Sequence, residues 1–110
     1  MDPAVRAYIK AIPASHRPLF DRLHGLILAL HPDVDMAISY AVVRHRTSKG
    51  DVFLGIWKGG VSLHAVDSAL IEEFKARHPK IKTGKGSLNF KVTDEFTDAE
   101  VRKVIRRRLG

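Results

Sequence analysis

The sequence contains no cysteine, which excludes disulfides, thiolate metal sites, iron–sulfur clusters and thiol nucleophiles. Long apolar runs are also missing, because the longest candidate, residues 26–30, is far shorter than the roughly 20 residues of a membrane span. The first residues, Met1 to Arg6, do not show a basic segment followed by an apolar one, as a signal peptide would. These absences predict a cytoplasmic protein that has no membrane partner.

Sequence motifs that mark catalytic sites are missing as well. No serine stands in a G-x-S-x-G elbow, and no H-E-x-x-H motif occurs. Gly84-Lys85-Gly86-Ser87 shares residue types with a phosphate-binding loop, but it lacks the G-x-x-x-x-G-K-[ST] spacing and leads into a strand pattern instead of a helix. We therefore expect a binding domain and not an enzyme.

The composition predicts one soluble domain with an excess of positive charge. A chain of 110 residues with 45% hydrophobic side chains is of the usual size for a single domain, so one domain over residues 1–110 is expected. Lys and Arg number 19 against 12 Asp and Glu, which gives a net charge of +7. This balance favours an anionic partner, although excess charge can also serve solubility alone.

Helix signals occur at both ends of the chain and between the strand patterns. Asp2-Pro3 starts a short helix that Pro13 ends, and Ser15 is the expected cap of a second helix that runs to Leu30. Apolar side chains at three- and four-residue spacing, from Leu19 to Leu30, support this second helix. Asp67 or Ser68 caps a third helix, and Thr97 with Glu100 has the spacing of a capping box for a last helix.

Alternating side chains predict four strands. They cover residues 38–43, 52–57, 61–66 and 88–92, with turns at residues 48–51 and at Gly59-Gly60. The expected order is α-α-β-β-β-α-β-α. Strands joined by hairpins and followed by helices indicate an α+β fold, in which an antiparallel sheet of about four strands packs with helices.

One group of residues has the chemistry of a weak metal site. Asp21 and His24 stand three residues apart on the second helix, and a short turn then carries one imidazole and two carboxylates. The candidate ligands are Asp21, His24, His31, Asp33 and Asp35. Imidazole and carboxylate together suit a divalent or ferrous ion, whereas the alternative is ordinary turn chemistry around Pro32-Asp33.

A second group of residues favours an anion. The segment Lys82–Ser87 places two glycines beside lysines, so that backbone N–H groups and positive charge lie together. The candidate residues are Lys82, Gly84, Lys85, Gly86 and Ser87, with Tyr40 and Trp57 as possible walls of a pocket between the sheet and the helices. The alternative is a tight loop whose glycines let it lie against the sheet.

The last helix adds further cations that could contact nucleic acid phosphates. They are Arg102, Lys103, Arg106, Arg107 and Arg108. Three successive arginines point in three directions around a helix, so a solvated terminal helix is the alternative interpretation. Basic residues also stabilise a helix C-terminus in their own right.

Three segments together resemble the YdhG-like family of small bacterial domains of unknown function. They are the two N-terminal helices, Ile38-Ser39-Tyr40 at the start of a strand, and the segment from Lys82 to Phe90. The resemblance covers nearly the whole chain and implies a frataxin-like architecture and an intracellular iron chaperone. Where the family strand continues Tyr-Gly-Met-Pro, this chain has Tyr40-Ala41-Val42-Val43, and its first two helices carry only Asp21 as an interior acid.

Two functional hypotheses follow. The first is a frataxin-like iron chaperone, for which iron is the bound ion. The alternative is the binding of a small anion or of nucleic acid through the Lys82–Ser87 loop and the basic C-terminal helix. A protein partner is compatible with either hypothesis.

Overall fold

The structure, a computed structural model, describes all residues from 1 to 110 and contains four helices and six strands. The elements follow in the order α1 (Pro3–Lys10), α2 (Arg17–Leu30), β1 (Asp35–Ser39), β2 (Val42–Thr47), β3 (Gly50–Trp57), β4 (Gly60–His64), α3 (Ser68–Arg77), β5 (Lys82–Thr83), β6 (Ser87–Lys91) and α4 (Asp98–Leu109). The predicted α+β class is therefore confirmed. None of the helices has the length and apolar character that crossing a membrane requires.

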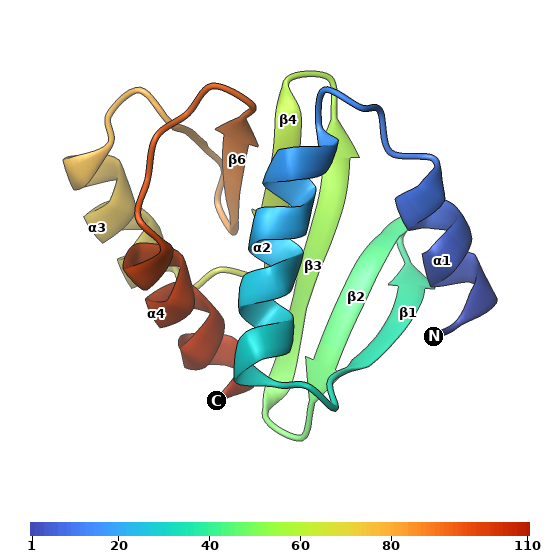
Figure 1. Cartoon of the computed structure of the whole chain (residues 1–110). Helices are drawn as coiled ribbons and strands as arrows, with labels where there is room; N and C mark the ends of the chain where they lie inside the picture. Colours follow the sequence, from blue (N-terminus) through green and yellow to red (C-terminus); the bar gives the residue numbers. More distant parts are fainter.

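The six strands form one open sheet in the order β1-β2-β3-β4-β6-β5, and every neighbouring pair is antiparallel. The helices pack on one side of this sheet, with α1 against β1 and β2, α2 against β4, and α4 against β3. Figure 1 shows α2 crossing in front of the central strands β3 and β4. The result is a two-layer arrangement of sheet and helices.

The hydrophobic core lies between these two layers. Because side chains alternate along a strand, every second residue of the central strands points toward the helices. The inward side chains are 0–1% exposed and are Val52, Leu54, Val61, Leu63, Leu88 and Phe90. They meet the apolar face of α2, whose Phe20, Leu23 and Ile27 are as deeply buried.

Three of the four predicted helix caps are present. Asp2 Oδ1 accepts from the N–H groups of Ala4 and Val5, Asp67 Oδ1 accepts from Ala69, and Thr97 forms the capping box with Glu100. The predicted cap at Ser15 was wrong, because its hydroxyl is engaged with His16 Nδ1 at 2.8 Å. His16 takes the cap position without a capping side-chain bond, and its Nε2 contacts the carbonyls of Trp57 and Lys58.

The prediction of about four strands was wrong in number for two reasons. Residues 38–43 do not form one strand: β1 ends at Ser39 and β2 begins at Val42. Tyr40 and Ala41 form the two-residue turn between them, with φ angles of 54° and 61°, as in a type I′ turn. Residues Lys82–Thr83 add the short strand β5, which pairs with β6 at the edge of the sheet.

Candidate functional site

The sheet has a second face that no helix covers, and we call it the open face. Its side chains alternate with those of the core, and none of them belongs to the buried hydrophobic cluster. The open face carries Asp35, Ala37, Ser39, Val42, Arg44, Arg46, Asp51, Phe53, Gly55, Trp57, Ser62, His64, Lys82, Ser87, Asn89 and Lys91. Aromatic, cationic and hydrogen-bonding side chains therefore share one surface.

The register aligns four of these side chains in one row across the sheet. Arg44 on β2 lies opposite Phe53 on β3, Phe53 lies opposite His64 on β4, and His64 lies opposite Ser87 on β6. Directly opposed side chains are close enough to contact one another. The row therefore joins a cation, an aromatic ring, an imidazole and a hydroxyl in a fixed sequence.

A hollow of about 340 Å³ lies over this row. It is lined by Tyr40, Val42, Phe53, His64 and Ala65, so its walls are largely apolar. The ring of Tyr40 stands edge-on to that of Phe53, with centroids 6.3 Å apart, and Tyr40 itself is 90% exposed. Partial burial lowers the pKa of His64 below its ordinary value of 6.5, so the imidazole is neutral at pH 7 and acts as a hydrogen-bonding group.

The backbone at the rim of this hollow is strained. Tyr40, Ala41 and Ala65 are the non-glycine residues with positive φ, and all three lie at or beside the hollow. An alanine or tyrosine in the left-handed region costs roughly 1–2 kcal/mol. Strain of this kind is common at binding sites, where the surrounding structure holds a conformation that local preference disfavours.

Trp57 marks the opposite end of the open face. The Nζ of Lys82 lies 5.4 Å from the centroid of the Trp57 ring, within the range of a cation–π interaction. The indole Nε1 is buried and has no hydrogen-bond partner. Between the two aromatic ends, Ser62 Oγ donates to Asn89 Oδ1 at 2.6 Å, which leaves the amide NH₂ of Asn89 available for another acceptor.

Two arginines differ in how far acids neutralise them. Arg46 makes a bidentate pair with Asp51, with distances of 2.6 and 3.0 Å, and this pair raises the pKa of Arg46 and lowers that of Asp51. Arg44 contacts Asp35 through one Nη2 at 3.4 Å, and its Nε has no partner. Arg44 is therefore less completely paired than Arg46, although its unpartnered Nε is buried.

The glycine-containing loop is a tight turn between β5 and β6. The N–H of Gly84 donates to the carbonyl of Ser87 at 2.9 Å, and the carbonyl of Gly86 accepts from Val66 at 3.0 Å. A side chain at Gly84 would crowd the Ser87 hydroxyl. The turn directs Lys82 and Ser87 to the open face, while anion binding by Lys85 stays a prediction.

The sequence had suggested that Tyr40 and Trp57 line a pocket between the sheet and the helices, but the structure places them elsewhere. Tyr40 lies in the β1–β2 turn, and Trp57 shares the strand alternation of Phe53. Both are therefore on the open face, on the other side of the sheet from the helices. Four of the predicted ligand residues, Tyr40, Trp57, Lys82 and Ser87, come together on this surface.

The cations of α4 lie in the helix layer and are not part of the open face. Lys103 pairs with Glu73 at 3.0 Å, and Arg107 pairs with Asp67 at 3.5 Å. Arg108 Nε donates to the backbone carbonyl of Asp51 at 3.4 Å. The loop and the C-terminal helix therefore do not form one joint basic surface with Lys82.

The five predicted metal ligands are not gathered at one point. No group of three or more His, Asp or Glu side chains is placed to hold a metal ion. Asp21 pairs with Arg17 at 3.0 Å, Asp35 pairs with Arg44, and His24 is buried. Iron binding at these residues thus stays a prediction without a ligand set.

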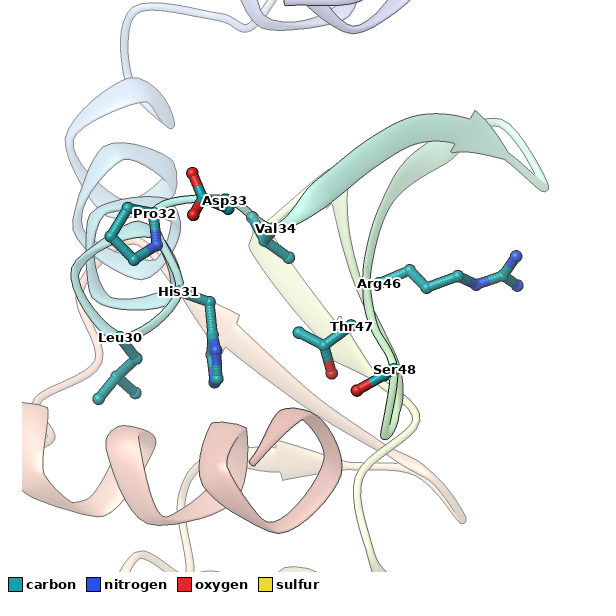
Figure 2. Close-up of a pocket in the computed structure, with 8 residues that line it drawn as sticks. All are labelled: Leu30, His31, Pro32, Asp33, Val34, Arg46, Thr47 and Ser48. Carbon is teal, nitrogen blue, oxygen red and sulfur yellow. The ribbon is translucent and has the colours of Figure 1, made fainter.

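His31 and Asp33 do lie at one hollow, of about 320 Å³, but they do not converge. Figure 2 shows the His31 ring pointing toward α4 and the Asp33 carboxylate pointing away from that ring. His31 Nε2 contacts the carbonyl of Gly110 at 2.5 Å, while Thr47 Oγ1 donates to the carbonyl of Leu109 at 2.8 Å. These contacts hold the end of α4 against β2.

A further hollow, of about 410 Å³, lies beside the end of α3 and is built on structural contacts. His78 Nε2 and Arg77 Nε contact Glu100 Oε2 at 2.7 and 3.2 Å. Burial opposes ionisation of Glu100, but hydrogen bonds from Thr97 and His78 lower its pKa to about 2. This cluster fastens α3 to the start of α4.

Sequence reasoning missed Arg44, Phe53 and His64 as site residues. The signal was present in the alternation of residues 52–57, which assigns Phe53 and Trp57 to the same side of a strand. Which side the helices cover is a tertiary property, and the strand pattern alone does not give it.

The comparisons with known proteins identify the fold. No protein-family model and no curated protein matches this chain in sequence. Its structure is similar to the crystal structure of YdhG, a protein of the DUF1801 family from Bacillus subtilis, with a TM-score of 0.76 and 11% sequence identity. The match covers 96% of this chain and 88% of that one, so the predicted YdhG-like fold is confirmed.

Proposed function

We propose that this chain binds single-stranded nucleic acid on the open face of its sheet. The observation that carries the proposal is the presence of aromatic rings and cations, of which Lys82 has no acidic partner, on one surface that no helix covers. Proteins that bind single strands combine such rings, on which bases stack, with a positive groove that follows the backbone. The net charge of +7 favours the same kind of partner.

The arrangement assigns a role to each end of the surface. Tyr40 and Phe53 form one stacking wall beside the hollow, and Trp57 forms the other, about 13 Å from Phe53 at four residues along β3. Arg44 and Lys82 stand beside the two aromatic ends, where they can neutralise phosphates.

Hydrogen-bonding groups between the two ends are suited to base edges. The free amide of Asn89 and the neutral imidazole of His64 offer donors and acceptors without charge. The proposal is one of binding without catalysis. It includes a cytoplasmic location, which a sequence without cysteine supports.

The proposal is tested by titrating fluorescein-labelled 12-nucleotide single strands with the whole chain while anisotropy is measured over a range of salt. The logarithm of the binding constant is expected to fall linearly with the logarithm of the salt concentration, because binding releases counterions from the strand. Trp57 is the only tryptophan, so quenching of its emission reports directly on stacking at that end of the open face. A duplex and heparin serve as polyanions that do not offer unstacked bases.

Three single substitutions, each of which removes one positive charge, test where on the protein the nucleic acid binds. Arg44→Ala and Lys82→Ala are each expected to reduce affinity and to lower the salt slope by about 1, whereas Arg106→Ala on α4 leaves both unchanged. Equal losses for all three variants would contradict an open-face site. Equal affinity for heparin and for the single strand would reduce the proposal to non-specific charge attraction, and binding of mononucleotides alone would indicate a small anionic ligand.

Iron delivery remains the prediction that the family resemblance implied. The scattered positions of Asp21, His31, Asp33 and Asp35 offer it no ligand cluster, so no second function is proposed on that basis. Anaerobic titration with Fe(II), with Asp33→Asn as the variant, tests it separately from nucleic acid binding.

A further inference from the structure

Three side chains with metal-ligating atoms meet on the covered side of the sheet, away from the open face. His24 comes from α2, Met36 from β1 and His45 from β2, and Met36 and His45 lie directly opposite each other in the strand register. His45 is 0% exposed and His24 is 7% exposed, while Met36 is half-buried. Neither the nucleic acid proposal nor the predicted iron ligands use this group as a set.

The distances between these side chains suit a shared ion. His24 Nε2 forms a hydrogen bond of 3.4 Å with Met36 Sδ, and the rings of His24 and His45 have centroids 5.3 Å apart in an edge-to-face arrangement. A nitrogen about 2.0 Å and a sulfur about 2.3 Å from one metal, at a tetrahedral angle, stand about 3.5 Å apart. The observed separation of nitrogen and sulfur therefore already matches that of two ligands to one metal.

His45 provides the second, independent observation. Both of its ring nitrogens are buried, and neither makes a hydrogen bond of good geometry, although the backbone carbonyls of Val43 and Val52 lie close enough to the ring to favour its charged form. Buried polar groups in proteins nearly always have a partner, so an imidazole with two unpartnered nitrogens needs an explanation. A metal ion between His45 and His24 would give one of those nitrogens its partner.

The protonation states also fit ligation. The pKa of His45 is lowered to about 3, mainly by burial and in addition by the neighbouring His24, against the opposing effect of the Val43 and Val52 carbonyls. Burial likewise lowers the pKa of His24, against the effect of Asp21. Both rings are therefore neutral at pH 7 and have a free lone pair, the state that a metal requires.

We propose that His24, Met36 and His45 bind one Cu(I) ion. A thioether is a soft ligand that favours Cu(I), and imidazole accepts copper readily. Hard cations prefer carboxylates and Fe(II) sites usually combine imidazole with a carboxylate, whereas the nearest acid on α2, Asp21, is held at the surface by Arg17. The site is walled on one side by Phe20, whose ring centroid lies 5.3 Å from that of His24.

The test is an anaerobic titration of the whole chain with Cu(I) in competition with a chromogenic Cu(I) chelator. Ag(I), a soft ion that does not change oxidation state in the assay, is used in parallel, with Zn(II) and Fe(II) as harder competitors. One equivalent of Cu(I) is expected to bind, and X-ray absorption should show one sulfur and two nitrogen ligands. Met36→Leu keeps the size and apolar character of the side chain but removes the sulfur.

Loss of an outer-shell partner alone costs roughly 10- to 100-fold in metal affinity, so Met36→Leu, which removes a direct ligand, is expected to cost at least about tenfold. His64→Gln, which changes the open-face histidine, is the matched control and should bind Cu(I) as the parent does. Imidazole NMR signals of His24 and His45 should shift with Ag(I), while those of His64 stay in place. Unchanged Cu(I) affinity in Met36→Leu, absence of sulfur from the absorption spectrum, or a shift of His64 alone would each overturn the proposal.

Discussion

Phe90 and Phe53 belong to the same sheet but to opposite faces of it. Phe90 is 0% exposed and contacts Phe74 and Phe96, with ring centroids 5.7 and 4.4 Å away. Phe53 has one aromatic neighbour, the highly exposed Tyr40, and borders a hollow. The strand alternation thus divides two tasks, because one face holds the fold together and the other leaves aromatic rings for a ligand.

The first prediction compares these two phenylalanines directly and carries the largest expected effect. Phe90→Ala should lower the free energy of unfolding by about 3–5 kcal/mol, because it opens a cavity in the core. Phe53→Ala should lower it by only about 1 kcal/mol, since its side chain is partly exposed before the change. Urea unfolding followed by circular dichroism measures both values.

An equal decrease in the free energy of unfolding for the two variants would contradict the proposed difference between the two faces of the sheet. It would mean that the open face is buried in solution, for instance against a second copy of the chain. In that case the stability of the parent would depend on protein concentration, which the same unfolding experiment detects.

The second prediction concerns acid, and its effect is smaller. The folded-state pKa of His45 is about 3, below its ordinary value of 6.5, so the unfolded chain takes up the proton first as the pH falls. The stabilisation of the folded state by the neutral His45 ring is therefore complete above pH 6.5 and is lost progressively below this pH. His45 alone should lower the free energy of unfolding by roughly 2 kcal/mol between pH 7 and pH 5.

His45→Leu is the variant that sharpens this prediction. It keeps an apolar side chain of similar size in the core and should reduce the dependence on pH between 7 and 5, leaving the contributions of His24 and His64, whose pKa values are also lowered. Glu100 does not obscure the result. Its pKa is lowered from 4.5 to about 2, so its contribution to the free energy of unfolding is lost mainly below pH 4.5. An unchanged slope in His45→Leu would show that His45 is not the titrating group.

The third prediction separates stability from binding at the rim of the hollow, and its effect is the smallest. Ala41→Gly should raise the free energy of unfolding by up to about 1 kcal/mol, because φ at this position is 61°. Tyr40→Asn should also suit the turn, but it removes the exposed ring. Ala41→Gly should therefore bind the single strand as the parent does, whereas Tyr40→Asn should bind it more weakly.

Thermal unfolding and anisotropy together check this pair. A loss of affinity in Ala41→Gly would show that the strained turn itself, and not the Tyr40 ring, serves binding. Full affinity in Tyr40→Asn would remove Tyr40 from the site.

The sequence predicted much of this fold because its local signals are strong. Three kinds of signal each act over a few residues: proline in the first turn of a helix and just after its end, the Thr97–Glu100 capping box, and the alternation of residues 52–57 and 61–66. The structure contains the corresponding elements. The β1–β2 turn was missed because Tyr40-Ala41 is not a typical turn pair, and the strand pairing stabilises its positive φ angles.

The candidate site was predicted only in part, for a reason that lies in tertiary structure. Tyr40, Trp57, Lys82 and Ser87 were singled out from the sequence, but they were assigned to the wrong side of the sheet or to a loop. Their common surface depends on strand pairings between residues up to dozens of positions apart, such as His64 with Ser87. Likewise, His24 and His45 meet only because α2 packs across the first hairpin.

The central claim, that the open face is the ligand-binding surface, is tested most directly by mapping amide chemical shifts of the ¹⁵N-labelled chain during titration with a short single strand. The account predicts that the largest changes fall on Phe53, Trp57, His64, Asn89 and the Trp57 indole N–H, while α4 changes little. Changes confined to α4 and to Lys85, with the central strands unaffected, would contradict it.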